Sequence, residues 1–196
     1  STGATLYNGT VNFTADYNGT TYQLRQTVSG NGIETYTLSG SQDYTLAKDV
    51  ASLSSSFTVD SVANQAHWGA ERTYDYFYTK HNRNSFDNAG GAIRSYVHYS
   101  TNYVNAFWDG SRMTYGDGDR SRGYKPLVAI DICGHEITHG VTQYAAALTY
   151  SGESGALNES FSDIFGEAVE TVVRQNGAVL VEAERAGAIT GVEEAI

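Results

Sequence analysis

The sequence carries His135 and His139 with Glu136 between them, in the run His-Glu-Ile-Thr-His. Residues four apart lie on the same face of an α-helix, so both imidazoles can reach one metal ion. A glutamate next to the first histidine can serve as general base toward a water molecule in an open coordination position. The pattern therefore predicts a zinc site with hydrolytic chemistry.

A third zinc ligand has to come from another segment, because a catalytic zinc usually keeps three protein ligands and one open position. The run from Gly155 to Asp163 offers two carboxylates, Glu159 and Asp163. They are four residues apart and project from the same side of a helix. We expect Glu159 to complete the metal site and Asp163 to accept the outer N–H of a ligand histidine.

Two helices must position these groups. An apolar lead-in at Val128 to Ile132 precedes the histidines, and Asp131 is a suitable acid for a helix N-terminus. Apolar residues then recur at helical spacing in each segment, which predicts a helix for each. They are Ile137, Val141, Tyr144 and Ala145 in the first segment, and Leu157, Phe161, Ile164, Phe165, Ala168 and Val172 in the second.

Upstream, the pattern is typical of strands. Alternating stretches at Thr20 to Gln26 and Glu34 to Leu38 are separated by Asn-Gly turns. We predict the following further elements: a first helix from Ser61 to Lys80, strands at Ile93 to Tyr99 and Val104 to Trp108, the latter at a sheet edge, and a loop from Asp109 to Gly123.

Composition narrows the class of protein. The chain has 196 residues, of which 40% are hydrophobic and 17% charged, as in folded globular proteins. Its net charge of -10 argues against nucleic acid or anionic membranes as partners and suits divalent cations. No apolar run of 18 residues is present, so we expect no membrane span. Cys133 is the only cysteine and is expected to be a buried free thiol rather than a nucleophile.

Several further motifs occur in order along the chain. They are Thr73-Tyr74-Asp75-Tyr76, His81-Asn82-Arg83, Val97-His98-Tyr99, Asn105 to Gly110, Met113, and Tyr115 to Asp119. Together with His135 to His139 and Gly155 to Asp163, they resemble the thermolysin-like family of neutral metalloproteases. The resemblance runs from roughly Gly30 to Glu170. It implies an α+β fold in which a β-rich N-terminal lobe (1–145) carries the zinc-binding helix, and residues 146–196 begin an incomplete α-helical lobe.

The resemblance also implies roles for individual residues. His135, His139 and Glu159 correspond to zinc ligands, Glu136 to the general base, and Asp163 to the partner of His135. Tyr150 corresponds to a tyrosine that stabilises the tetrahedral oxyanion. The substrate-binding residues it implies are Asn105 and the carbonyl of Ala106 along an extended peptide, Trp108 packed beside that edge, and Tyr124 and Leu127 in an apolar pocket.

Calcium is a second cofactor that the resemblance implies. Asp131 and Glu170 match two carboxylates of the family's calcium site. Ca²⁺ prefers 6 to 8 oxygen ligands, however, so two carboxylates are too few. Further ligands would be expected where Ala178, Leu180 and Ala183 stand, and Glu182 or Glu184 can substitute after a small shift.

Some residues have simpler interpretations without the resemblance. Tyr150 would be a packing residue in a chain with 15 tyrosines, and Asp163 would belong to a solvated helix face. We expect His67, His81 and His98 to be structural hydrogen-bonding residues, because none has a second ligand at metal spacing.

The sequence is compatible with two functions. The first is a secreted zinc endopeptidase in its mature form, which cleaves peptides or proteins on the amino side of apolar residues. The second arises because the family's helical domain supplies a histidine and an arginine that this sequence does not contain, and because composition changes after about residue 177. In that case the chain is a catalytically crippled zinc-binding fragment that needs a companion C-terminal chain.

Overall fold

The computed structural model describes residues 1–185, with side chains described as far as Gly177. Its helices are α1 (Ser61–His81), α2 (Ile130–Ala145) and α3 (Gly152–Arg185), and it has two short 3-10 turns, η1 (Tyr44–Leu46) and η2 (Arg120–Arg122). The strands are β1 (Thr2–Ala4), β2 (Thr10–Asn12), β3 (Asp16–Tyr17), β4 (Tyr22–Gln23), β5 (Arg25–Gln26), β6 (Ile33–Thr37), β7 (Lys48–Asp49), β8 (Ala51–Ser52), β9 (Ser56–Phe57), β10 (Ile93–Tyr99), β11 (Ala106–Trp108) and β12 (Met113–Gly116).

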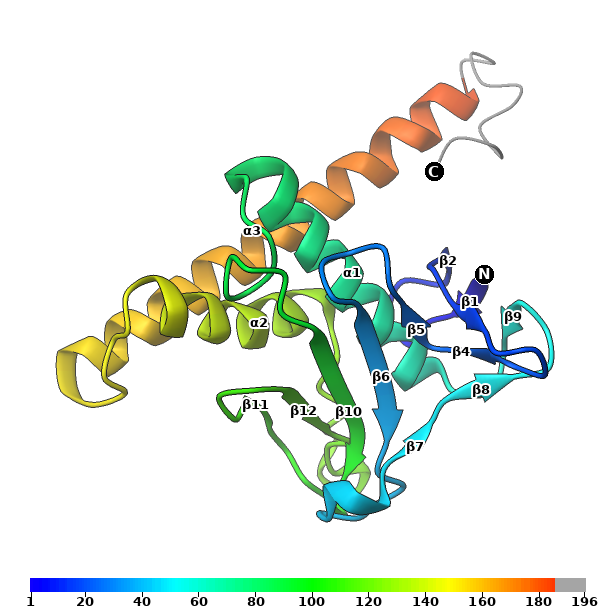
Figure 1. The fold of residues 1–196 in the computed structure, drawn as a ribbon, viewed down its shortest axis with the longest axis horizontal. Coiled ribbons are helices and arrows are strands. Elements are labelled where there is room, and N and C mark those ends of the chain that lie inside the picture. Colours follow the sequence, from blue (N-terminus) through cyan, green and yellow to red (C-terminus); the bar gives the residue numbers. More distant parts are fainter. Residues whose placement is uncertain (186–196) are drawn as a thin grey trace.

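The largest sheet has the strand order β11-β12-β10-β6-β5, and β7 also pairs with β6. Strand β10 runs parallel to both β6 and β12, whereas β11 is antiparallel to β12 and lies at the edge. Two smaller sheets, β2-β1-β9 and β3-β4-β8, come from the first 60 residues. Figure 1 shows α1 and α2 beside the large sheet and α3 extending beyond it. The expected α+β fold, a β-rich lobe followed by helices, is confirmed.

Most of the predicted elements form. The first helix covers Ser61–His81, and the strand at Ile93–Tyr99 has the predicted limits. The Asn-Gly turns place Gly9, Gly19 and Gly32 at φ values of 70°, 95° and 113°. Glycine populates this left-handed region at no steric cost, which explains its position in these turns.

The loop predicted from Asp109 to Gly123 is wrong in its first half, because β12 forms within it. Met113, Thr114 and Tyr115 are buried, and β12 lies between β10 and β11 as an internal strand. The surrounding Gly and Asp residues favour a loop by local propensity. Burial against two neighbouring strands outweighs that propensity. The edge strand is also shorter than predicted and begins at Ala106.

Glycines allow the three helices to approach closely. A Cβ atom on Gly69 of α1 would lie 2.7 Å from the Sγ atom of Cys133 on α2. A Cβ atom on Gly166 of α3 would lie 2.5 Å from the carbonyl oxygen of Asp131 on α2. Cys133 is thus a buried free thiol, as predicted. The contact at Gly166 determines how near α3 lies to the histidines of α2.

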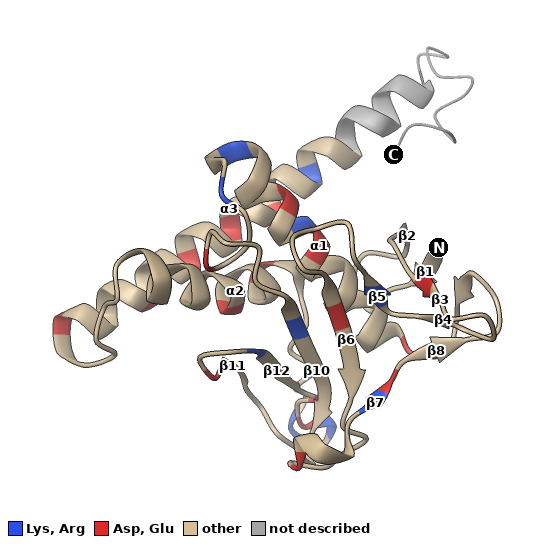
Figure 2. Cartoon of the chain, in the orientation of Figure 1, with Lys and Arg blue, Asp and Glu red and all other residues tan. Residues whose placement is uncertain are grey.

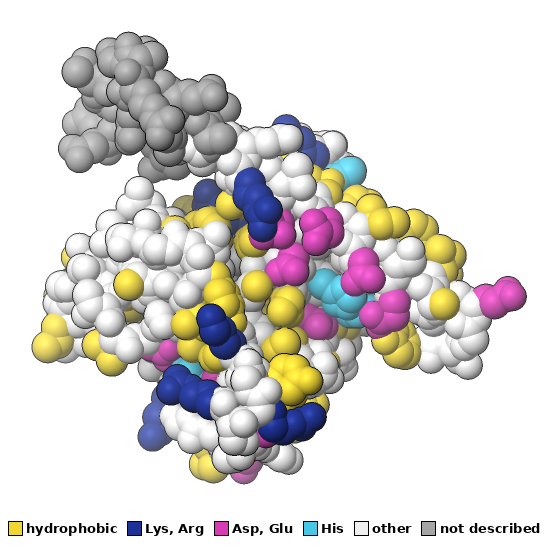
Figure 3. All heavy atoms as spheres, turned by 180° about the vertical axis from the view of Figure 1, so that it is seen from behind, with side chains coloured by type: hydrophobic (Ala, Val, Ile, Leu, Met, Phe, Trp, Pro, Cys, Tyr) yellow, Lys and Arg dark blue, Asp and Glu magenta, His cyan; other side chains and the backbone are white. Residues whose placement is uncertain are grey.

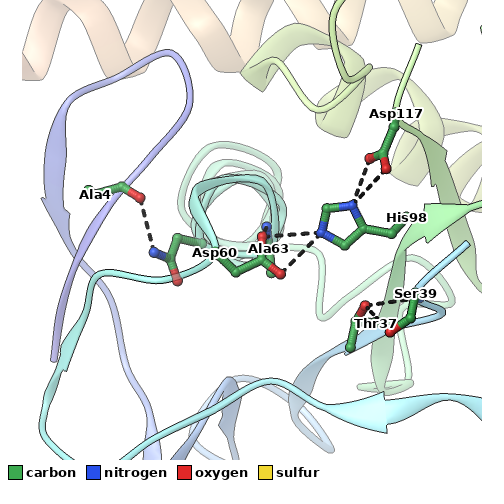
Figure 4. A network of polar contacts seen from close by, with 8 residues as sticks. Ala4, Thr37, Ser39, Asp60, Ala63, His98 and Asp117 are labelled. Carbon is green, nitrogen blue, oxygen red and sulfur yellow. Dashed lines mark hydrogen bonds and ion pairs between the residues drawn. The ribbon is translucent and has the colours of Figure 1, made fainter. Parts of the chain in front are cut away.

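The three remaining histidines have the hydrogen-bonding roles that the sequence predicts, and His81 Nε2 lies 3.2 Å from the Tyr76 hydroxyl. His98 Nδ1 lies 2.7 Å from Asp117 Oδ1, and its Nε2 lies 3.1 Å from Asp60 Oδ2 (Figure 4). Burial lowers the pKa of His98, but the hydrogen bonds to these carboxylates outweigh burial and raise it to about 10. Asp60 also caps α1 by accepting the Ala63 N–H, so His98 holds the start of α1 to the end of β10. His67 bonds Thr14 and Thr35.

Among the described residues, no helix has both the length and the apolar character needed to cross a membrane.

Candidate metal centre and active-site cleft

Three predicted ligands converge at the crossing of α2 and α3. His135 and His139 turn their Nε2 atoms toward each other at a distance of 3.0 Å. Glu159 places Oε2 3.3 Å from His135 Nε2 and Oε1 3.5 Å from His139 Nε2. Two ring nitrogens and a carboxylate in this arrangement form a group able to hold a metal ion.

The outer nitrogens of both histidines face hydrogen-bond acceptors. Asp163 Oδ1 lies 2.9 Å from His135 Nδ1, and Asn158 Oδ1 lies 2.8 Å from His139 Nδ1. An acceptor at Nδ1 favours the tautomer with hydrogen on that nitrogen, which leaves a lone pair on Nε2. Burial also lowers the pKa of His139, which favours its neutral, metal-binding form. The donor set therefore fits a zinc ion.

Glu136 lies beside these groups without converging on them. Its side chain is buried, with 6% of the residue exposed. Burial raises the pKa of Glu136 to about 7, the nearby charge of Glu159 adds to the rise, and a hydrogen bond from the Trp108 backbone opposes it. A carboxyl group with a pKa near neutrality is suited to accept a proton as a general base.

A cleft of about 810 Å³ opens over these residues. One wall is Asn105 to Trp108, which includes edge strand β11, and another is formed by α2 and the start of α3. Trp108 is held in place by donating from Nε1 to Gln143 Oε1 at 2.8 Å. Figure 3 shows the histidines at the surface, with acidic side chains gathered around them. The cleft thus combines a free strand edge with a candidate metal centre.

Two of the other three residues predicted to bind substrate or the oxyanion line a hollow at this centre, and one does not. Tyr150 lines the cleft, is 67% exposed, and donates its hydroxyl hydrogen to Glu159 Oε1. Leu127 lines an adjoining hollow of about 480 Å³ together with Asn105, His135 and Glu136. Tyr124 lines neither hollow. Its exposed ring lies 5.3 Å from the Arg122 guanidinium.

The residues expected to bind calcium also lie together. Asp131 and Glu170 converge with Glu167, so the structure adds a carboxylate that the sequence reading did not include. Glu170 also accepts from Arg174 Nη2 at 2.6 Å. The further calcium positions considered from the sequence lie outside the described side chains; they are Ala178, Leu180, Glu182, Ala183 and Glu184.

Comparison with known proteins agrees with this geometry. Residues 1–143 match the family described as thermolysin metallopeptidase, catalytic domain, and residues 146–188 match its alpha-helical domain. The chain belongs to the thermolysin metallopeptidase family. The match extends beyond Glu170, where the sequence motifs were expected to fade, and it begins before Gly30.

Individual members of the family are similar over most of this chain. Bacillolysin from Brevibacillus brevis is 48% identical over 172 residues, which are 87% of this chain and 32% of that protein. Thermolysin from Bacillus sp. (strain EA1) is 44% identical and covers 79% of this chain and 29% of its own length. The chain thus spans about a third of these relatives.

A solved structure shows the same fold. The precursor of protealysin, a metalloproteinase from Serratia proteamaculans, aligns with a TM-score of 0.67 and 33% identity. The alignment covers 84% of this chain and 48% of that one.

Two residues of this thermolysin-like site were missed by the sequence reading. Asn158 faces His139 Nδ1, and Ser162 Oγ lies 3.1 Å from the same nitrogen. Both are polar but uncharged, whereas metal-ligand patterns in a sequence are recognised by histidines and acids. Asn158 and Ser162 are four residues apart, and each comes one position before Glu159 or Asp163. This spacing places them on one side of α3, next to the two acids, and is the sequence signal for their role.

Asp163→Ala is expected to lower zinc affinity about 10- to 100-fold, the usual effect of removing a partner of a ligand histidine. The residue is exposed, with 75% of the side chain accessible, so folding should be unaffected. Zinc titration in the presence of a competing chelator measures the change. Asp163→Asn retains an oxygen acceptor and should recover most of the affinity. If Asp163→Ala binds zinc normally, Asp163 belongs to a solvated helix face.

Gly166→Ala should weaken zinc binding at least about 10-fold, an effect of the size seen when ligand orientation is lost. The added methyl group would meet the Asp131 carbonyl at 2.5 Å and push α3 away from α2, carrying Glu159 with it. Gly177→Ala is the matched control on the same helix, because no atom of the described residues lies within 4 Å of its Cβ position. Both changes favour helix formation by about 1 kcal/mol. The two variants therefore differ only in the contact between α3 and α2, which Gly166→Ala disturbs and Gly177→Ala does not. Equal zinc affinity in the two variants would show that the close approach does not position Glu159.

Proposed function

We propose that this protein is a secreted zinc metalloendopeptidase that cleaves peptide bonds on the amino side of apolar residues. The observation that carries the proposal is the convergence of the His135 and His139 ring nitrogens and the Glu159 carboxylate beside the buried Glu136. Family membership supports the same chemistry, and relatives that include a neutral protease from Bacillus pumilus support secretion.

His135, His139 and Glu159 would hold the zinc ion. When bound, zinc lowers the pKa of a coordinated water toward neutrality and polarises a carbonyl group. Glu136 then takes the proton from the attacking water and passes it to the leaving amine, a role that its raised pKa favours. Tyr150 lines the cleft with its hydroxyl beside Glu159, and there it would donate to the developing oxyanion.

The substrate would bind as an added strand. β11 pairs only with β12 among the described strands, so its outer edge is free to hydrogen-bond an extended peptide. Asn105 and the Ala106 carbonyl would contact the peptide backbone there, while Leu127 lines the hollow for the apolar side chain and Trp108 supports the edge. Tyr124 does not line this pocket, and its ring lies beside the Arg122 guanidinium instead.

Calcium is a second proposed cofactor. Asp131, Glu167 and Glu170 place three carboxylates together, and hard oxygen ligands of this kind suit Ca²⁺. The ion would link α2 to α3 and thereby support the crossing that positions Glu159.

We divide the chain into a lobe of 1–145 and the beginning of a second lobe at 146–196. Helix α3 in the second lobe exposes apolar side chains that further residues would cover. Leu157, Phe161 and Ile164 are 45%, 37% and 58% exposed and follow one another at helical spacing. An exposed apolar stripe usually marks a contact surface. We therefore propose that further residues of an α-helical lobe, in the same or a companion chain, cover this stripe. If they do not, the alternative is a zinc-binding fragment without full activity.

The test compares the isolated chain with the full-length protein. We expect both to bind zinc, and the isolated chain to hydrolyse an apolar peptide about 10²- to 10³-fold more slowly for each missing oxyanion donor. Adding a C-terminal half should restore activity. Full activity from the isolated chain would show that the missing half is dispensable. Zinc binding without hydrolysis, even in the full-length protein, would favour the fragment alternative over the peptidase.

A further inference from the structure

The segment from Asp119 to Lys125, here called the basic loop, concentrates positive charge in an acidic protein. It contains Arg120, Arg122 and Lys125, which are three of the chain's 12 basic residues, whereas the net charge is -10. All three side chains are exposed. The loop follows β12 near the lower end of β10 in Figure 1, where Figure 2 shows basic positions.

The basic loop is held in one shape by its own hydrogen bonds. Asp119 Oδ1 accepts from the Ser121 backbone N–H at 3.0 Å, and the Tyr124 N–H donates to the Asp119 carbonyl at 2.9 Å. Gly118 has a φ of 72° and packs against the Lys125 carbonyl, leaving no room for a side chain. The charges are therefore presented on a fixed turn, which lowers the entropy lost when they bind a partner.

No acid in the part of the chain that the structure describes forms a close ion pair with these three side chains, although the Ser121 hydroxyl and, less strongly, the Arg122 charge lower the pKa of Asp119. Among the described residues, arginines elsewhere in the chain form ion pairs with acids; they are Arg25, Arg72, Arg94, Arg112 and Arg174. None of those pairs includes a residue of the basic loop. The two carboxylates closest in sequence have other contacts, because Asp117 binds His98 and Asp119 stabilises the turn itself. The basic loop thus offers positive charge to an external partner.

The loop leads to the hollow that adjoins the cleft. Lys125 is two residues from Leu127, so it lies within about 7 Å of a residue that lines the hollow beside His135 and Glu136. The Leu127 N–H donates to the Gly116 carbonyl at 3.1 Å, and the Gly116 N–H donates to the Asn105 carbonyl at 2.9 Å. An extended peptide advances about 3.3 Å per residue, so a chain leaving the cleft past Leu127 reaches the loop within a few residues.

We infer that the basic loop binds an acidic side chain of the polypeptide substrate, two to four residues from the cleaved bond on the Leu127 side. The inference rests on the proposed peptidase function. Charge complementarity supports it in a second way, because acidic side chains surround the histidines (Figure 3) and repel an acid at the bond itself. The loop thereby selects substrates that are apolar at the bond and acidic a short distance beyond it.

The test uses the full-length protein and quenched peptides that carry either Glu or Gln three residues from the bond, on one side or the other. At low salt, Glu on the Leu127 side should raise kcat/KM roughly 3- to 10-fold over Gln, as two exposed ion pairs allow. The preference should disappear at 1 M salt, where the screening length is about 3 Å.

The Arg122→Gln/Lys125→Gln variant should lose this preference while cleaving the Gln peptide as before. Lys48→Gln/Lys80→Gln is the matched control, since it removes two exposed cations far from the cleft and should keep the preference. A Glu preference that survives in the loop variant, or one that the control also loses, would overturn the inference.

A binding measurement separates this inference from the proposed function. In the Glu136→Gln full-length protein, fluorescence anisotropy of the labelled Glu peptide should show binding about 3- to 10-fold tighter than that of the Gln peptide. The loop substitutions should remove that difference. Absence of cleavage in the wild type would contradict the peptidase proposal alone, whereas equal binding of the two peptides would contradict the role of the loop.

Discussion

Replacing Glu136 by Gln is expected to abolish peptide hydrolysis and leave zinc bound. The side chain is buried beside the metal centre but does not converge with His135, His139 and Glu159, so its removal takes away a base and no ligand. Loss of a general base costs about 10² to 10⁴ in rate, which would leave little measurable activity. The amide has the same size, so the packing around it should persist.

Zinc content and hydrolysis must be measured on the same preparation of the full-length protein. Glu153→Gln serves as the control, because Glu153 is exposed in the first turn of α3. Zinc loss in proportion to the loss of activity would make Glu136 a structural residue and refute its assignment as the base.

The second large effect is expected for Glu159→Ala, which should lose zinc itself. Glu159 would supply one of three protein ligands, because its two oxygens lie 3.3 Å and 3.5 Å from the histidine nitrogens. We expect zinc affinity to fall by more than about 100-fold, beyond the range for a residue that only orients a ligand. The variant also removes the acceptor of the Tyr150 hydroxyl.

Glu153→Ala, on the same helix, is the matched control and should bind zinc normally. Metal analysis after dialysis against a weak chelator distinguishes the two variants. If Glu159→Ala retains one zinc per chain, the third ligand lies elsewhere.

Local periodicity explains which parts of the site were predictable. His135 and His139 share a helix face because four residues make about one turn, and the same rule places Glu159 and Asp163 on one side of α3. The fold class and the ends of α1 and β10 also follow from local patterns of apolar residues. These properties depend on neighbours within a few positions, so they can be read from the chain itself.

Other properties depend on residues far apart in sequence. β12 forms in a segment of loop-like composition because β10 and β11 bury it from both sides. Asn158 can hydrogen-bond His139 only because α3 crosses α2 next to that histidine. The carboxylate of Glu167 joins Asp131 and Glu170 for the same reason.

The residue types and their spacing along each helix are enough to assign the side chains able to bind a metal to one helix face. Tertiary packing brings the two faces together, because their contact depends on the close approach at Gly166. It also decided the character of Glu136, whose pKa rises to about 7 through burial. Spacing along a helix is set by backbone hydrogen bonds within a turn, whereas contact distance and burial are set by how side chains pack between elements.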